Sequence, residues 1–294
     1  MSITRTRIAT QARTWVIISA LTALFVGLGY LFGGSSGLIL FAGIAIVFNL
    51  VMFWFSDRLA LKASRARPVE RSEAPELYRD IEEIAATAGL PMPRVYLIPS
   101  EQPNAFATGR SPKKAAVAVT EGLLRYLPRE QVRGVLAHEL GHVANRDILV
   151  TTIAAMIGAA IAAMANILQF SMFFGGDDDD NNPLGIIGVL VAVIVAPLAA
   201  MILQLAVSRQ REYLADATAA QYLGEGRPLA EALATLQRGV EAVPMKVNPA
   251  TEALYIANPL SGRGAFASLF STHPPMEERI RRLRELDAAN GIHY

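Results

Sequence analysis

The chain has 294 residues, of which 52% are hydrophobic and only 18% are charged, and its net charge is +1. This composition is more hydrophobic than is usual for a purely soluble protein. The lack of a basic face interleaved with aromatic residues argues against nucleic acid as a partner. The sequence contains no cysteine, which excludes disulfides, thiolate metal sites and a cysteine nucleophile. Any metal must therefore be held by histidines and carboxylates.

Long apolar stretches predict membrane-spanning helices, because a helix needs roughly 20 apolar residues to cross a bilayer core of ~30 Å. A signal peptide is a weaker interpretation of the first stretch, since that stretch is long and no clean cleavage site follows it. The Gly- and Ser-rich segment 33–37 instead joins it to the second stretch as a hairpin. The four stretches are 15–32, 38–55, 148–170 and 184–207.

Basic residues flank one end of each predicted hairpin, and such residues normally stay in the cytoplasm. They predict a multi-pass protein of the cell (inner) membrane with both termini cytoplasmic. The aspartates at 177–180 lie at the far end of the second hairpin and are expected to form a solvated loop rather than a cation site. The flanking residues are Arg5, Arg7, Arg13, Arg58, Lys62, Arg65, Arg67, Arg146, Arg209 and Arg211.

Two polar regions lie outside the predicted spans, and we expect them to form one cytoplasmic domain. The predicted domains are an N-terminal transmembrane hairpin at 1–56, a cytoplasmic domain built from 57–147 and 208–294, and a second transmembrane hairpin at 148–207. The domain is thus interrupted in sequence by the second hairpin.

The polar regions read as mainly helical with a small β-sheet. Apolar residues from Leu77 to Ala88 repeat with helical spacing, and Gly89 followed by Pro91 ends that helix. Three β-prone runs follow, at 95–98, 105–108 and 115–120. Further helices are predicted at 128–145, 211–222, 228–240 and 275–287, with a long Pro- and Gly-containing loop at 242–271.

The helix that opens at Pro128 carries the sequence His138-Glu139-Leu140-Gly141-His142. Residues four apart share a helix face, so two neutral imidazoles can bind one zinc ion there. Glu139 stands beside the first imidazole, where its carboxylate is placed to act as a general base on an activated water. With only four histidines in the chain, a chance occurrence of this pattern is improbable. We therefore predict one Zn²⁺ site at His138 and His142.

A catalytic zinc normally has three protein ligands, and the residues leave the third one open between His273, His293 and a carboxylate. Glu212 is the best candidate on geometric grounds. If the helices carrying His142 and Glu212 both continue out of the bilayer, the two side chains stand at similar heights above it. Asp216 lies one turn beyond Glu212 and is placed to accept the free N–H of a ligating histidine.

Several segments together resemble the HtpX-type heat-shock membrane proteases of peptidase family M48. The resemblance rests on the histidine motif and on three further runs, and it extends over nearly the whole chain. It implies a zincin-like α+β zinc metalloendopeptidase domain, with misfolded or damaged membrane proteins as substrates. The runs are Arg211-Glu212-Tyr213-Leu214-Ala215-Asp216, Asn104-Ala105-Phe106-Ala107-Thr108-Gly109 and Ser271-Thr272-His273-Pro274-Pro275.

The resemblance also implies individual roles. Glu212 becomes the third zinc ligand, and His273 corresponds to a histidine that steadies the oxyanion. Asn104, Ala105, Phe106 and Ala107 match an edge strand that pairs with an extended substrate, and an exposed strand edge suits this purpose physically.

Two other functions remain open at this point. A CAAX prenyl protease carries similar zinc motifs but has more membrane spans, and a membrane chaperone or scaffold would use zinc for folding only. A transporter function is less consistent with the sequence, because no ionisable residue lies in the middle of a predicted span. The sequence leaves the oligomeric state undetermined.

Overall fold

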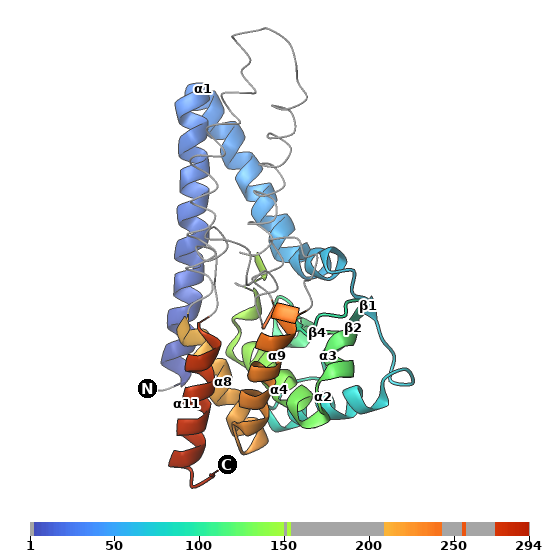
Figure 1. The fold of residues 1–294 in the computed structure, drawn as a ribbon. Coiled ribbons are helices and arrows are strands. Elements are labelled where there is room, and N and C mark those ends of the chain that lie inside the picture. The colour runs from blue at the N-terminus through green and yellow to red at the C-terminus, as the bar shows by residue number, and fades with distance from the viewer. Residues whose placement is uncertain (1–2, 150–151, 154–208, 243–254, 257–273, 294) are drawn as a thin grey trace.

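The fold is seen in a computed structural model that describes residues 3–149, 152–153, 209–242, 255–256 and 274–293. Within these residues the chain is mainly helical with one small mixed sheet (Figure 1). The helices are α1 (Ile3–Ala63), α2 (Pro75–Thr87), α3 (Glu121–Tyr126), α4 (Arg129–Asn145), α8 (Arg209–Leu223), α9 (Arg227–Ala242) and α11 (Met276–Ala289). The strands are β1 (Arg67–Pro68), β2 (Arg94–Ile98), β3 (Ala105–Thr108) and β4 (Ala116–Thr120), and a 3-10 turn spans Pro112–Lys114.

The sheet has the strand order β1-β2-β4-β3, with β2 and β4 parallel and the other pairs antiparallel. β3 is therefore an edge strand. Neighbouring residues of a strand point to opposite faces, and both faces of this sheet are covered. Val117 and Val119 of β4 belong to the larger core, whereas Ala116 and Ala118 belong to a smaller one.

Helices cover the face of the sheet that bears the larger core. The apolar stripe of α2 fits the spacing of its sequence, with Leu77, Ile81 and Ile84 buried against that core. α4 lies within the same core, and α9 approaches it closely. A Cβ at Gly134 would lie only 2.6 Å from the backbone nitrogen of Leu229, so glycine is required where α4 and α9 meet.

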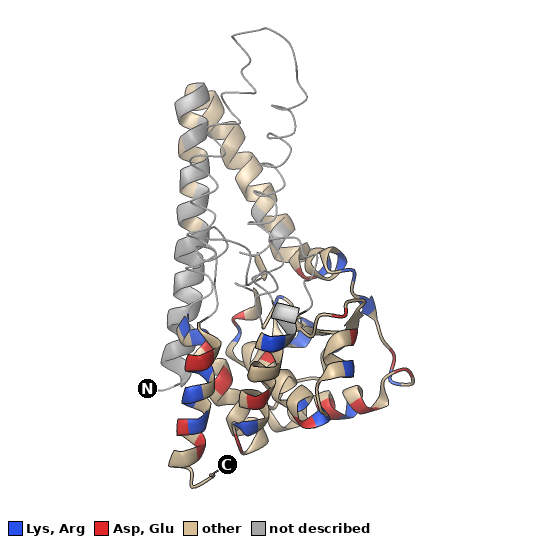
Figure 2. Cartoon of the chain, viewed as in Figure 1, with Lys and Arg blue, Asp and Glu red and all other residues tan. Residues whose placement is uncertain are grey.

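The opposite face of the sheet is covered by the end of α1. Ala60 and Leu61 are buried there, and the Asp57 carboxylate lies 2.8 Å from the Arg94 guanidinium. Figure 2 shows no Lys, Arg, Asp or Glu in the described part of the adjoining arm of α1, whereas these residues gather over the helices and strands that follow α1.

Helix α1 reverses direction at Gly34, whose φ of 56° and ψ of −141° are not helical, and this gives the two arms in Figure 1. Such a positive φ is readily adopted by glycine. Within the described residues no single helix has the length and hydropathy needed to cross a membrane. One pair of segments, Gly34–Phe48 and Phe53–Ala63, meets both conditions together but is bent by 64°.

The predicted elements of the polar regions agree with those observed to within two or three residues. The prediction of a mainly helical fold with a small sheet is confirmed, although the short strand β1 and helix α3 were not predicted. Other predictions lie outside the described residues. These are the two later spans beyond residue 153, the aspartates at 177–180, His273 and most of the loop at 242–271.

Candidate active site

The histidine motif lies in the second half of α4, facing α8. His138 and Glu139 are buried, and His142 is half-buried. Gly141, inside the motif, allows the two helices to approach, since a Cβ there would lie 3.2 Å from the Ala215 carbonyl oxygen of α8. The motif thus supplies both functional side chains and the small residue that brings α8 near.

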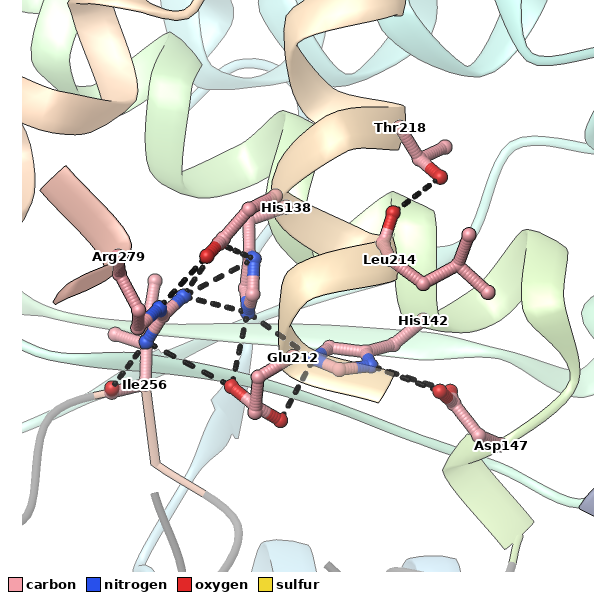
Figure 3. Close-up of polar contacts among 9 residues, drawn as sticks. His138, His142, Asp147, Glu212, Leu214, Thr218, Ile256 and Arg279 are labelled. Carbon is pink, nitrogen blue, oxygen red and sulfur yellow. Dashed lines mark hydrogen bonds and ion pairs between the residues drawn. The ribbon is translucent and has the colours of Figure 1, made fainter. Parts of the chain in front are cut away.

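Glu212 of α8 reaches both imidazoles (Figure 3). Its carboxylate oxygens lie 3.7 Å from His138 Nε2 and 3.5 Å from His142 Nε2, and the two Nε2 atoms are 3.0 Å apart. Donors that each bind one zinc ion at ~2.0–2.2 Å can be at most ~4.4 Å apart, and all three separations meet this limit. The three side chains therefore fit a single metal ion.

A buried ion pair supports this cluster from the side of α11. Arg279 is fully buried and binds the Asp216 carboxylate through two hydrogen bonds, of 2.6 and 2.9 Å. Asp216 in turn lies 2.9 Å from His138 Nδ1. Burial acts to raise the pKa of Asp216, but Arg279 more than offsets this and lowers it below the usual range. An ionised Asp216 accepts the Nδ1–H of His138 and leaves the Nε2 lone pair of that ring toward Glu212.

His142 has its own carboxylate partner, which the sequence analysis did not identify. The buried Asp147 lies 3.1 Å from His142 Nδ1, because α4 ends at Asn145 and Arg146 adopts a left-handed conformation that turns the chain back. This break contradicts the assumption that the helix of His142 runs on without interruption past residue 148. Ile148 is instead buried in the larger core.

The carboxylates around His142 favour positive charge at that ring. Burial acts to lower the pKa of His142, but Asp147, Glu212 and Glu139 outweigh it and raise the pKa to about 10. The same negative potential attracts a cation between the two imidazoles. Burial, together with the Arg279 charge, lowers the pKa of His138 to about 4, so that this ring is neutral at pH 7. A metal ion bound between the rings would displace the proton that the carboxylates favour on His142.

Glu139 lies beside the cluster rather than within it. Burial raises the pKa of this carboxyl to about 7, against the opposing effects of His142 and of a hydrogen bond from the Ala107 backbone N–H. A pKa near the working pH suits a group that must both accept and return a proton.

The predicted substrate strand is β3 with the residue before it. Asn104, Ala105, Phe106 and Ala107 are all buried, and the Ala105 carbonyl already accepts a hydrogen bond of 3.1 Å from the Ile256 N–H. The edge is thus placed next to Glu139, but it is less open than the sequence suggested.

The structure brings together His138, Glu139, His142, Glu212 and Asp216, and their roles in metal binding and catalysis stay predictions. His293 is exposed in the C-terminal tail, away from this cluster. Arg279 was missed because it lies within a strongly charged helix, Met276–Ala289, where one arginine among several has no sequence feature that marks it as buried. Asp147 carried a weak signal, since it lies two residues after the end of the motif helix.

A mutation at Asp147 tests how this carboxylate acts on the metal site. We expect Asp147→Asn to weaken metal affinity about 10- to 100-fold, because the amide oxygen still accepts a hydrogen bond but no longer provides negative charge beside His142. The measurement is a zinc titration against a chelating dye, with the melting temperature as a control for folding. Unchanged affinity in a folded variant would show that Asp147 does not support the metal.

Two imidazoles and a glutamate around one point, with a second buried glutamate beside them on a small sheet and packed helices, define a metalloprotease. The sequence model of peptidase family M48 matches residues 71–287. The chain therefore belongs to peptidase family M48.

Relatives of known name agree with this assignment. The chain is 50% identical over 278 residues to a protein named "Protease HtpX homolog" from Syntrophobacter fumaroxidans, covering 93% of this chain and 98% of the relative. It is 48% identical over 281 residues to another of that name from Pyrococcus furiosus, covering 95% and 97%. The crystal structure of S. mikatae Ste24p has a similar fold, with a TM-score of 0.52 and 21% identity over 95% of this chain and 67% of that one.

Proposed function

We propose that the protein is a membrane-embedded zinc metalloendopeptidase that hydrolyses misfolded or damaged membrane proteins from the cytoplasmic side. The observation that carries the proposal is the cluster itself. Ligand atoms of His138, His142 and Glu212 all lie within 4.8 Å of one another, and the buried Glu139 is next to them.

Zinc is the metal that this donor set fits best, at one ion per chain. Two imidazoles and one carboxylate are a common catalytic zinc set, which keeps one coordination position for water or substrate. In our proposal Asp216 and Asp147 hold the two rings in the tautomer whose Nε2 atom is free to bind, since each carboxylate faces an Nδ1 atom.

Hydrolysis then depends on proton transfer by Glu139. When bound, zinc would supply the Lewis acidity that polarises the scissile carbonyl and lowers the pKa of the attacking water. Glu139 accepts the proton of the attacking water and delivers it to the leaving amine. We also propose that His273 steadies the oxyanion, by the resemblance of its sequence context alone.

The substrate is proposed to bind as an extended strand along Asn104, Ala105, Phe106 and Ala107. Support comes from the position of β3 at the edge of the sheet and from the hydrogen bond between Ala107 N–H and Glu139. Main-chain pairing recognises any unfolded segment whatever its sequence, as a protease of damaged proteins requires.

Association with the lipid bilayer is supported by the apolar surface of α1. Ile39, Leu40 and Val47 of one arm have 70%, 61% and 61% of their surface exposed, and exposed apolar residues gathered in this way mark a membrane or protein interaction site. We propose four spans in a multi-pass inner-membrane protein, with hairpins at 1–56 and 148–207 and the protease domain at 57–147 and 208–294. The basic residues Arg58 and Lys62, at the end of α1, support a cytoplasmic position for that domain.

Metal removal tests the proposed chemistry. We expect the purified full chain, in lipid vesicles, to lose hydrolysis of unfolded casein after treatment with a zinc chelator and to regain it with one Zn²⁺ per chain. Hydrolysis by a chain from which zinc has been removed, verified by elemental analysis, would exclude the mechanism.

A second substrate comparison in the same vesicles tests the substrate class. A membrane protein carrying a destabilising substitution should be cut faster than its folded parent, and a prenylated CAAX peptide should not be preferred. Equal cleavage of the folded and destabilised proteins would reject the substrate class while leaving the enzyme chemistry intact.

A further inference from the structure

Two residues remote in sequence from β3 lie along its outer edge. The Ile256 N–H donates to the Ala105 carbonyl oxygen at 3.1 Å, on the side of β3 that faces away from β4. Tyr255 and Ile256 are both buried, so this short segment is packed as firmly as the strand that it contacts.

The side chains of these two residues lie on opposite faces of the sheet. The Tyr255 ring packs edge-on against Phe106, at 5.3 Å between ring centroids, within the smaller core. The next side chain, Ile256, belongs to the larger core on the other face of the sheet. Two neighbouring side chains on opposite faces and a backbone hydrogen bond to the sheet edge are features that this segment shares with a peptide bound by strand addition.

The other backbone group of Ile256 is held by Arg279. Arg279 Nη1 donates to the Ile256 carbonyl oxygen at 3.4 Å, and the same nitrogen lies 3.6 Å from the Glu212 carboxylate (Figure 3). The guanidinium is fixed by Asp216, so it approaches the carbonyl from a rigid support. The N–H and C=O of one residue are thus both bound within reach of the metal cluster.

We propose that Ala105 and Arg279 form a binding subsite for the backbone of one substrate residue, and that Ile256 occupies this subsite until a substrate displaces it. The proposal rests on the proposed pairing of substrate with β3. Ala105 accepts the N–H of the bound residue and Arg279 donates to its C=O. Because every non-proline residue offers these two groups, the subsite binds extended peptide without regard to side chain.

The first test weakens the binding of residue 256 to the subsite and leaves Ala105 and Arg279 unchanged. Ile256→Pro replaces the isoleucine side chain and removes the backbone N–H that bonds to Ala105. Ile256→Ala also replaces that side chain but keeps the N–H. For hydrolysis of unfolded casein by the zinc-loaded full chain, we expect the KM of Ile256→Pro to be about three- to tenfold lower than that of Ile256→Ala, with kcat within about twofold. Equal KM values, or a lower kcat at equal KM, would overturn the proposal and make the segment a structural part of the site.

The second test needs no change at position 256. In the Glu139→Gln chain, saturating unfolded casein should speed hydrogen exchange at the Ile256 amide, since a displaced occupant loses its hydrogen bond to Ala105. Unchanged or slower exchange would contradict displacement. This measurement tests the proposal even in the case that the Ile256→Pro variant does not fold. Absence of zinc-dependent casein hydrolysis in the unmutated chain would instead refute the proposed function itself.

Discussion

Replacing Glu139 by Gln should lower kcat for peptide hydrolysis by about 10³-fold while the metal stays bound. Gln keeps the size of the side chain and can still accept the Ala107 hydrogen bond, but it cannot take a proton from water.

The matched control is Glu130→Gln, an exposed glutamate on the same helix, which should leave kcat unchanged. Metal content is measured by elemental analysis beside the kinetics. A Glu139→Gln chain that is fully loaded with metal and fully active would remove Glu139 from the mechanism and would favour a structural metal in a non-proteolytic protein.

Replacing Glu212 by Ala should instead remove the metal, with at least about a 100-fold loss of zinc affinity and a corresponding loss of activity at limiting zinc. The substitution deletes one of three donors, a larger change than losing a carboxylate that only orients a ligand. It also leaves Arg279, whose Nη1 lies 3.6 Å from the Glu212 carboxylate, with less negative charge nearby.

Glu231→Ala, at an exposed position of α9, provides a comparison for the loss of a carboxylate as such. Zinc affinity is measured by competition with a chelating dye, and circular dichroism checks that both variants are folded. If Glu212→Ala held zinc as tightly as Glu231→Ala, the third ligand would have to be another group.

The sequence predicts the metal pair well because the pair is local. Four-residue spacing on a helix brings His138 and His142 together whatever the rest of the chain does. Local sequence patterns also predict β3, whose observed bounds agree with the prediction, and α2, whose apolar stripe packs against the larger core.

Long-range packing is less accessible from the sequence. The prediction of Glu212 as a ligand rested partly on an assumed continuous helix after His142, yet the chain turns at Arg146. Glu212 lies close to the histidines because α8 packs beside Gly141. The buried Arg279 and the segment at Ile256 depend on contacts across the domain, and no spacing rule marks them. A charged side chain becomes buried only when a partner such as Asp216 neutralises it, which a linear sequence does not display.

The account depends most directly on where the metal binds. Anomalous diffraction at the zinc edge, from crystals of the zinc-loaded full chain, should show one peak at ~2.0–2.2 Å from His138 Nε2, His142 Nε2 and an oxygen of Glu212. A peak elsewhere, or one bound by the two histidines while Glu212 remains distant, would contradict it.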